Sequence, residues 1–287
     1  MTFKHYAKED YAAVCDFLIE LNRADTCHIH WNWARFEWMA EHPEFDQSAL
    51  SSIGLWTDGD RVVGAAIYDM YFGEGFCAAL PSHAQIFPDI LDYAFRELRD
   101  GGGFGFAICD DRPDEIAAAE QAGFSAVEQD ETMLCMPLRC PLKVSLPDGY
   151  RFASLDPVRD AYALQWLFWQ GFDHGSDREE FERTEEIIPR VRPHFNPDLC
   201  LAALDPSGEP AACCCVWYLG DTDYAYLEPV CTVPAHRGCG LAKALIYEAL
   251  NRAHRLGAQR AFVLSDMDFY RKLGFEPHRH FTFYWKQ

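Results

Sequence analysis

YAYLEPVCTVPAHRGCGLA, residues 224–242, is the stretch that decides the fold of the second half of this chain. It predicts a strand that ends near Val233, a short loop at Arg237-Gly-Cys-Gly240 and a helix directly after it. Glycines tolerate positive φ and let the backbone approach a ligand. The first-turn amides of a helix lack intrahelical acceptors and lie at the positive end of its dipole. The segment therefore predicts a phosphate or pyrophosphate site, or alternatively an ordinary strand–loop–helix turn.

Pro229 lies inside the predicted strand. Proline cannot donate to a sheet ladder, so this strand must be bulged or must part from a neighbour at that point. A parted strand exposes backbone groups to which an extended, amide-containing ligand arm can add, and the pantetheine arm of coenzyme A is such a ligand. The alternative is an edge strand.

The helix predicted over Ala242–Gly257 has one apolar face and a glycine as its stop. That face comprises Ala242, Leu245, Ile246, Ala249, Leu250, Ala253 and Leu256. Further helices are predicted at Asp10–Asn22, Ile90–Arg99, Val158–Gly171 and Glu179–Val191. Strands between these helices, including Arg260–Leu264, indicate an α/β or α+β fold with a mixed sheet.

The chain also repeats itself weakly at about 150 residues. Hairpin patterns occur at Leu55–Ile67 and Leu201–Trp217, and Gly123-Phe124 is matched 151 positions later by Gly274-Phe275. A final strand follows each Gly-Phe pair, at Glu131–Leu138 and His280–Lys286. The proline-rich connector 137–147 favours an extended link. We therefore expect two domains, 1–140 and 141–287.

A third element is the segment Ser265-Asp-Met-Asp-Phe-Tyr-Arg-Lys-Leu-Gly-Phe275. Ser265 and Asp268 resemble a capping box, which predicts a short helix that carries Tyr270. Together with the central stretch, this segment resembles the GNAT superfamily of N-acetyltransferases. The matching motifs are Val233-Pro-x-x-Arg237-Gly-x-Gly-Leu-Ala242 and Phe269-Tyr270-x-x-x-Gly274-Phe275. The family often has asparagine or alanine shortly before the tyrosine, whereas Asp266, Met267 and Asp268 stand here.

The resemblance implies two tandem domains, each with a mixed, mostly antiparallel central sheet flanked by helices. It implies that acetyl-CoA lies between two splayed strands. The implied pyrophosphate-binding residues are Arg237, Gly238, Cys239, Gly240, Leu241, Ala242 and Lys243. The backbone at Cys231, Thr232 and Val233 would hold pantetheine and the thioester carbonyl. Tyr270 would protonate the leaving thiolate, and Glu228 would accept the proton of the amine. The rival bases are His174, His194 and His236.

The first half matches these motifs poorly. Residues 75–88, where the phosphate loop belongs, have no RGxG, and no tyrosine lies four positions before Gly123. We therefore expect the first domain to be a degenerate GNAT-like copy that shapes the acceptor pocket, an arrangement similar to that of mycothiol synthase relatives.

Composition restricts the partners. The chain has 287 residues, of which 45 are acidic and 25 basic, for a formal charge of −20. This balance argues against nucleic acid and anionic membrane as partners and favours a cationic acceptor, such as a polyamine or an amino sugar. The first ten residues do not resemble a signal peptide and no segment resembles a spanning helix, so a cytoplasmic location is expected. Three consecutive cysteines, Cys213 to Cys215, indicate free thiols rather than disulfides.

Three other patterns are interpreted structurally. The glycines of 101–105 follow a helix and precede a strand, the reverse of a dinucleotide loop, so they indicate a helix stop. Cys27-His28-x-His30 lacks a recognisable third ligand, and no metal is predicted. The aromatic group Trp31, Trp33, Phe36 and Trp38 is interpreted as core or domain interface rather than a substrate box.

The sequence therefore predicts an acetyl-CoA-dependent N-acetyltransferase. It would transfer acetyl to a primary amine of a small acceptor, bound between the domains, by direct attack in a ternary complex. An acetyl-cysteine intermediate on Cys231 or Cys239 is the less favoured route. The alternatives are a non-catalytic protein that binds or senses CoA or acetyl-CoA, and an N-acetyltransferase of peptides or proteins. Oligomerisation stays open.

Overall fold

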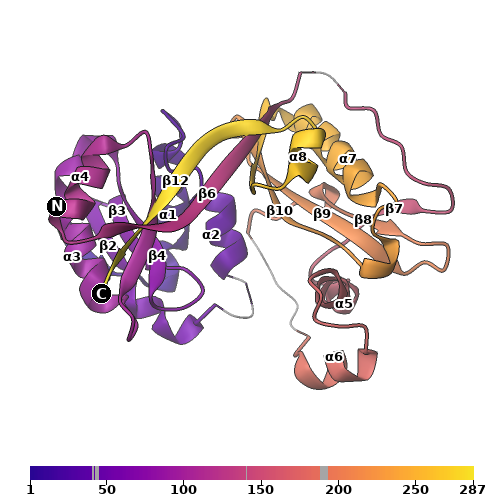
Figure 1. The fold of residues 1–287 in the computed structure, drawn as a ribbon, viewed down its shortest axis with the longest axis horizontal. Helices are drawn as coiled ribbons and strands as arrows, with labels where there is room; N and C mark the ends of the chain where they lie inside the picture. Colours follow the sequence, from indigo (N-terminus) through magenta and orange to yellow (C-terminus); the bar gives the residue numbers. More distant parts are fainter. Residues whose placement is uncertain (41, 43–44, 140, 188–192) are drawn as a thin grey trace. The chain divides into compact units, whose positions relative to one another are not determined.

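The computed structural model of the chain describes residues 1–40, 42, 45–139, 141–187 and 193–287 (Figure 1). It contains two compact units. Unit 1 comprises Met1–Leu134, Leu264–Tyr270 and Glu276–Gln287, and unit 2 comprises Cys135–Val263 and Arg271–Phe275. Each unit has a mixed, mostly antiparallel sheet flanked by helices, as expected from the alternation of patterns.

Unit 1 has the strand order β1-β2-β3-β4-β5-β12-β6. Along the described strand pairs from β1 to β12, β4–β5 is parallel, and β1–β2, β2–β3, β3–β4 and β5–β12 are antiparallel. The strands are β1 (Thr2–His5), β2 (Gly54–Asp58), β3 (Arg61–Tyr68), β4 (Glu74–Ala79), β5 (Phe104–Cys109), β6 (Ser125–Pro137) and β12 (Glu276–Lys286). The helices are η1 (Lys8–Asp10), α1 (Tyr11–Leu21), α2 (Trp33–Ala40), η2 (Gln47–Ser52), η3 (Pro81–Ile86), α3 (Phe87–Glu97) and α4 (Pro113–Gln121).

The last strand of the chain, β12, belongs to the sheet of unit 1. It pairs antiparallel with β5, from Phe281 opposite Cys109 to Lys286 opposite Phe104. Gly105 permits this pairing, because a β-carbon there would lie 2.4 Å from the Trp285 ring. The compact units therefore divide the chain differently from the expected domains 1–140 and 141–287, which remain a prediction about domain boundaries.

Unit 2 has the strand order β11-β10-β9-β8-β7, and Cys135–Pro137 of β6 lie next to β11. The strands are β7 (Arg151–Ser154), β8 (Cys200–Leu204), β9 (Pro210–Tyr218), β10 (Tyr224–Thr232) and β11 (Arg260–Leu264). The helices are α5 (Ala161–Gly171), α6 (Arg178–Thr184), η4 (Pro197–Leu199), η5 (Pro234–His236) and α7 (Leu241–Leu256), while α8 (Asp268–Lys272) divides between the units.

Two helices cover the two faces of the unit 2 sheet, α7 on one side and α5 on the other (Figure 1). In the predicted apolar stripe of α7, the side chains from Leu245 to Ala253 are buried and Ala242 is half-buried. Gly257 ends the helix with φ 122°, as predicted. Leu256, which the stripe included, is 55% exposed because it lies in the last turn beyond the sheet. On the opposite face, α5 packs against thiols and aliphatic side chains that include Cys213, Cys215 and Cys231.

Most of the predicted elements are present. The helices at 10–22, 90–99 and 158–171 correspond to α1, α3 and α5, and β11 has the predicted bounds. The helix predicted at Glu179–Val191 is wrong in length: α6 ends at Thr184, residues 185–187 are not helical, and 188–191 lie outside the described residues. The cysteines within the described ranges are free thiols. No helix in the described part of the chain has the length and apolarity needed to cross a bilayer.

Candidate functional site

Strand β10 is irregular at Pro229, as the sequence predicts. Its register with β9 shifts between Leu227 and Val230, which marks a bulge at Glu228-Pro229. On its other edge β10 runs parallel to β11, but the paired residues end at Tyr226 opposite Phe262. The strand therefore parts from β11 where the bulge begins. Beyond Tyr226 that edge of β10 does not pair with β11, and a ligand can add there as an extended arm.

The alternation of an antiparallel strand shows which backbone groups face that open edge. The Val233 amide donates to the Ala211 carbonyl at 2.9 Å, and Cys231 lies opposite Cys213, so these two residues face β9. Thr232 and Val230 therefore present their amides and carbonyls to the open edge. Cys231 packs its Sγ 3.6 Å from the Sγ of Cys213 and is buried. Three residues were predicted to bind pantetheine through their backbone: Cys231, Thr232 and Val233. Of these, only Thr232 has its backbone groups on the open edge of β10.

The loop after β10 ends in a run of backbone amides without protein acceptors. Gly238 and Gly240 have φ of 79° and 84°, and a β-carbon at either would meet open space. Gly240 is the N-cap of α7, no side chain caps this end, and the first bond into the helix runs from the Ala244 amide to the Gly240 carbonyl. Among the described residues, the amides from Gly238 to Lys243 have no acceptor.

This amide run has the properties of an anion site. It lies at the N-terminus of a 16-residue helix, where the dipole adds a partial positive charge. The loop is exposed, so the amides are accessible. A pyrophosphate supplies enough oxygens to satisfy several such donors at once. The structure thus gives the predicted residues Gly238, Cys239, Gly240, Leu241, Ala242 and Lys243 the arrangement that phosphate binding needs.

Arg237, which precedes this run of amides, has its backbone amide and its guanidinium hydrogen-bonded to other protein groups. Its amide donates to the Pro234 carbonyl at 3.2 Å. Its guanidinium donates through Nε to the Thr232 carbonyl at 3.0 Å and through Nη2 to the Gly171 carbonyl at 3.0 Å. Nη2 also lies 2.9 and 3.0 Å from the two carboxylate oxygens of Asp173. Sequence reasoning missed Asp173, because nothing in the local pattern after α5 indicates a partner 64 positions away.

The two predicted catalytic side chains lie on different elements. Glu228 is half-buried at the bulge of β10, and its carbonyl accepts a hydrogen bond from Trp217 Nε1 at 2.6 Å. Tyr270 is 8% exposed on α8, where its amide donates to the Met267 carbonyl at 3.1 Å. The Ser265 hydroxyl accepts from the Met267 amide at 3.2 Å, so Ser265 orders the turn before that helix.

Among the rival bases, His236 has its ring Nδ1 2.8 Å from the hydroxyl of Tyr150, the residue directly before β7. His174 is exposed, with its ring 5.3 Å from that of Trp169. His194 is half-buried. None of these three lies on β10, and Glu228 is the carboxylate placed at the point where the strand opens.

Unit 1 has splayed strands without an amide run. Its parallel pair β4–β5 is registered only at Glu74 opposite Gly105 and Gly75 opposite Phe106. The loop after β4 is η3, which starts with Pro81 and contains no glycine. Phe87 and Pro88 then open α3. Two prolines without N–H groups and the absence of positive-φ glycines leave this loop unable to form the arrangement seen in unit 2.

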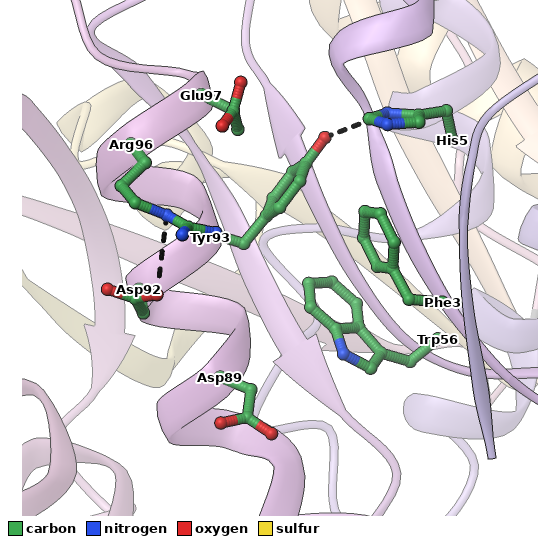
Figure 2. Close-up of a pocket in the computed structure, with 8 residues that line it drawn as sticks. All are labelled: Phe3, His5, Trp56, Asp89, Asp92, Tyr93, Arg96 and Glu97. Atoms are coloured by element: carbon green, nitrogen blue, oxygen red, sulfur yellow. Dashed lines mark hydrogen bonds and ion pairs between the residues drawn. The ribbon is translucent and has the colours of Figure 1, made fainter.

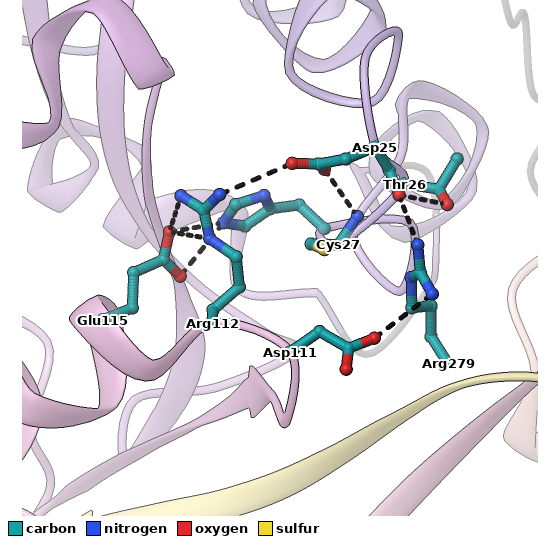
Figure 3. Close-up of polar contacts among 8 residues, drawn as sticks. Asp25, Thr26, Cys27, Asp111, Arg112, Glu115 and Arg279 are labelled. Atoms are coloured by element: carbon teal, nitrogen blue, oxygen red, sulfur yellow. Dashed lines mark hydrogen bonds and ion pairs between the residues drawn. The ribbon is translucent and has the colours of Figure 1, made fainter.

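A polar network in unit 1 joins α4 to the segment after α1 (Figure 3). Glu115 on α4 accepts from Arg112 Nη2 at 2.7 Å and lies 3.2 Å from His28 Nε2. Burial raises the pKa of Glu115, but His28 and Arg112 outweigh it and the net shift is downward. Arg112 also pairs with Asp25 at 3.4 Å, while Arg279 of β12 donates to the Asp25 carbonyl at 2.9 Å.

These contacts explain the Cys27-His28-x-His30 pattern. The His28 imidazole pairs with Glu115, and the His30 ring packs 4.1 Å from that of Phe281. Burial is the largest cause that lowers the pKa of His30 well below its usual value. In the described ranges, Cys27, His28 and His30 do not converge as a set of metal ligands. Trp31, Trp33, Phe36 and Trp38 are buried in unit 1, which agrees with their interpretation as core.

A shallow groove of about 480 Å³ lies elsewhere on unit 1, between α3 and the strands β1 and β2 (Figure 2). Its lining rings pack on one another: the centroid of Phe3 is 5.1 Å from that of Trp56 and 4.9 Å from that of Tyr93. The Tyr93 hydroxyl donates to the Ser52 carbonyl at 2.9 Å. No residue of the predicted site lines this groove.

Comparison with known proteins agrees with the geometry of unit 2. Residues 159–275 match the model of the acetyltransferase (GNAT) family. This part of the chain is similar to GNAT acetyltransferase domains. The match supports an acyltransferase enzyme, and the GNAT family uses acetyl-CoA as acyl donor. No curated protein sequence matches the chain closely enough to count as a relative.

Solved structures extend the GNAT likeness to the whole chain. A GCN5-related N-acetyltransferase from Sphaerobacter thermophilus has a TM-score of 0.60 at 15% identity, covering 99% of this chain and 95% of its own. A tandem GNAT protein from the clavulanic acid biosynthesis pathway has a TM-score of 0.62 at 15% identity, covering 99% and 98%. N-Myristoyltransferase from Saccharomyces cerevisiae has a TM-score of 0.52 at 14% identity, covering 99% and 77%. At these identities the likeness shows the fold, and the predicted tandem GNAT-like fold class is confirmed.

Proposed function

We propose that the protein is an N-acetyltransferase that transfers the acetyl group of acetyl-CoA to a primary amine of a small, cationic acceptor. The observation that carries the proposal is the run of amides from Gly238 to Lys243, which find no acceptor in the described part of the chain. The run follows a strand that bulges at Pro229. The amides suit a pyrophosphate, and the open edge of β10 suits the amide-containing pantetheine arm. One ligand, acetyl-CoA, uses both features.

The reaction needs three groups. Attack of the amine nitrogen on the thioester carbon forms the new C–N bond and breaks the C–S bond, while one proton leaves nitrogen and one reaches sulfur. Glu228 would accept the amine proton, directly or through a water molecule, because it lies at the bulge of β10. Backbone amides at the open edge of β10 would stabilise the developing oxyanion. Tyr270 would give its hydroxyl proton to the thiolate. Direct attack requires no acetyl-cysteine, which agrees with the burial of Cys231 against Cys213.

The acceptor is proposed to be cationic because of charge. The chain carries 20 more negative than positive charges, and a field of this sign attracts ammonium ions and raises their encounter rate. Unit 2 contributes to the charge through the exposed carboxylates of Glu179, Glu180 and Glu182 on α6. The free amine of a peptide or protein is the alternative acceptor.

Unit 1 is proposed to be the degenerate partner in a tandem arrangement similar to that of mycothiol synthase relatives. Its loop after β4 lacks the glycines of unit 2, and a packed polar network lies in its core. We propose a cytoplasmic location and no metal requirement. The alternative function, a sensor that binds acetyl-CoA without turnover, differs only in the chemistry at Glu228 and Tyr270.

The test combines an amine screen with two conservative variants. Purified protein is incubated with acetyl-CoA and spermidine, glucosamine or a short peptide, and release of free CoA thiol is measured. Tyr270→Phe and Glu228→Gln should each lower kcat about 10²-fold or more while the affinity for acetyl-CoA stays within a factor of about two. Binding without turnover on any amine, or turnover indifferent to both variants, would identify a sensor or a different catalytic pair.

A further inference from the structure

We propose that Arg237 is a positioning residue that fastens the phosphate loop to the end of α5 through Asp173, and that its guanidinium does not contact the pyrophosphate. The inference rests on the proposed acetyl-CoA site and assigns the role of two residues within it. Asp173, which no motif indicated, becomes part of the binding machinery.

The contacts of Arg237 join three segments of unit 2. Nε donates to the Thr232 carbonyl, at the end of β10, and Nη2 donates to the Gly171 carbonyl, at the end of α5. Both oxygens of the Asp173 carboxylate lie within 3.0 Å of Nη2. Charge-assisted hydrogen bonds of this kind are about twice as strong as neutral ones and are directional. The guanidinium thus holds the loop at a fixed distance from the strand and from the helix.

The end of α5 is built to receive this contact. A β-carbon on Gly171 would lie 2.5 Å from the Sγ of Cys231 and 2.8 Å from its Cβ, so the helix end touches β10 where only glycine fits. Asp173 follows with φ 63°, in the left-handed region that aspartate tolerates better than most side chains. Its amide donates to the Gln170 carbonyl at 3.2 Å, which ends the helical turn and aims the carboxylate at the loop.

A direct phosphate contact would require Arg237 to release these acceptors. The Gly171 and Thr232 carbonyls would each lose a charged donor, and the Asp173 carboxylate would lose its cation. The pyrophosphate has the amides from Gly238 to Lys243 available without any such loss. Because the Arg237 and Asp173 side chains are 44% and 63% exposed, their ion pair alone contributes little, and the effect comes from the joined contacts.

The two roles predict opposite results for Asp173→Asn. If Arg237 positions the loop, removal of the carboxylate loosens the loop, and the Kd for acetyl-CoA should rise about threefold. If Arg237 binds the pyrophosphate, the same change frees the guanidinium, and the Kd should fall. Asparagine suits the left-handed backbone at position 173, so the fold is preserved. Calorimetric titration at about 0.15 M ionic strength screens charges more than about 8 Å apart.

A double-mutant cycle separates a shared effect from a simple change of charge. Arg237→Ala should raise the Kd about tenfold, Arg237→Lys should resemble it because lysine lacks the forked geometry, and Asp173→Asn should have no further effect in the Arg237→Ala background. Asp221→Asn, an exposed carboxylate elsewhere in unit 2, is the charge-matched control. In turnover assays the variants should raise KM for acetyl-CoA and leave kcat unchanged.

The outcomes distinguish this inference from the function on which it rests. Wild type that fails to bind acetyl-CoA contradicts the proposed function. Wild type that binds, with Arg237→Lys retaining affinity and Asp173→Asn tightening it, overturns the positioning role alone. Weaker binding in Asp173→Asn that disappears in the Arg237→Ala background supports it.

Discussion

Unit 1 and unit 2 each contain a parallel strand pair that separates after two or three paired residues. The loops that follow these strands differ. In unit 2, β10 leads into a loop with two positive-φ glycines, and six consecutive amides remain unpartnered among the described residues. In unit 1, β4 leads into η3 with Pro81 at its start. Unit 1 also contains a polar network of Glu115, Arg112 and His28. Both units therefore have the separated strands, whereas anion binding also requires a few backbone positions with positive φ, which glycine adopts more readily than other residues.

The largest expected effect comes from removing the two positive-φ glycines of the unit 2 loop, which the corresponding loop of unit 1 lacks. Gly238→Asp with Gly240→Asp should weaken acetyl-CoA binding by about 100-fold or more, because each side chain strains a left-handed residue and each carboxylate repels the pyrophosphate. Calorimetry should find one site per wild-type chain and none in the variant. Gly220→Asp, also open to solvent but without positive φ, is the matched control and should bind normally. Two sites per wild-type chain would mean that unit 1 is a working copy.

The second change disrupts the polar network of unit 1. Glu115→Ala should lower the free energy of unfolding by about 3 kcal/mol, because the half-buried Arg112 guanidinium and the buried His28 ring lose their contacts with this carboxylate. Urea unfolding followed by tryptophan fluorescence measures the loss, and Glu120→Ala, exposed on the same helix, should stay within about 0.5 kcal/mol of wild type. The affinity for acetyl-CoA should be unaffected. A change in that affinity comparable to that of the loop variant would show that the network serves ligand binding.

Much of the unit 2 site could be predicted because its signals are local. Pro229 predicts the bulge, Gly257 ends α7, and the glycines at 238 and 240 mark the loop, since each residue acts through its own backbone angles. The partners of Arg237 could not be predicted, because Gly171 ends α5, Asp173 follows it, and only the tertiary fold brings both to the loop.

The assignment of the last strand shows the same limit on a larger scale. The alternation at His280–Lys286 predicts a strand, but not which sheet it joins. Its partner β5 lies more than 160 positions earlier, and pairing over such a separation depends on the shape of the completed sheet. The network of Asp25, Arg112 and Glu115 was missed for a related reason, since charged residues in sequence are ordinarily expected at the surface.

A smaller effect tests the close approach that unit 2 needs at the end of α5. Gly171→Ala should cost about 1–3 kcal/mol of stability, since its β-carbon would overlap Cys231 and force α5 away from β10. The same shift moves the Gly171 carbonyl from Arg237, so the Kd for acetyl-CoA should rise a few-fold. Thermal unfolding and calorimetry measure the two effects, with Gly220→Ala as the control. Unchanged stability would show that the helix end relaxes without strain.

The smallest effect concerns how β12 is held in unit 1. His280 donates through Nδ1 to the Asp110 carboxylate at 2.7 Å, and its Nε2 lies 3.3 Å from the Asp130 carboxylate. The hydrogen bond with Asp110 is the largest cause that raises the pKa of His280 above the usual 6.5. A raised pKa in the folded state stabilises the fold below pH 6.5, and this contribution is lost as the pH rises through the raised value. Because His280 is 45% exposed, the change should stay below about 1 kcal/mol.

Hydrogen exchange of the β12 and β5 amides, corrected for intrinsic rates, should show greater protection at pH 6 than at pH 8.5 in wild type. In His280→Gln this difference should shrink, because glutamine does not titrate, while the amides of β8 and β9 in unit 2 should respond equally in both proteins. A pH response of β12 that persists undiminished in His280→Gln would show that His280 does not cause it.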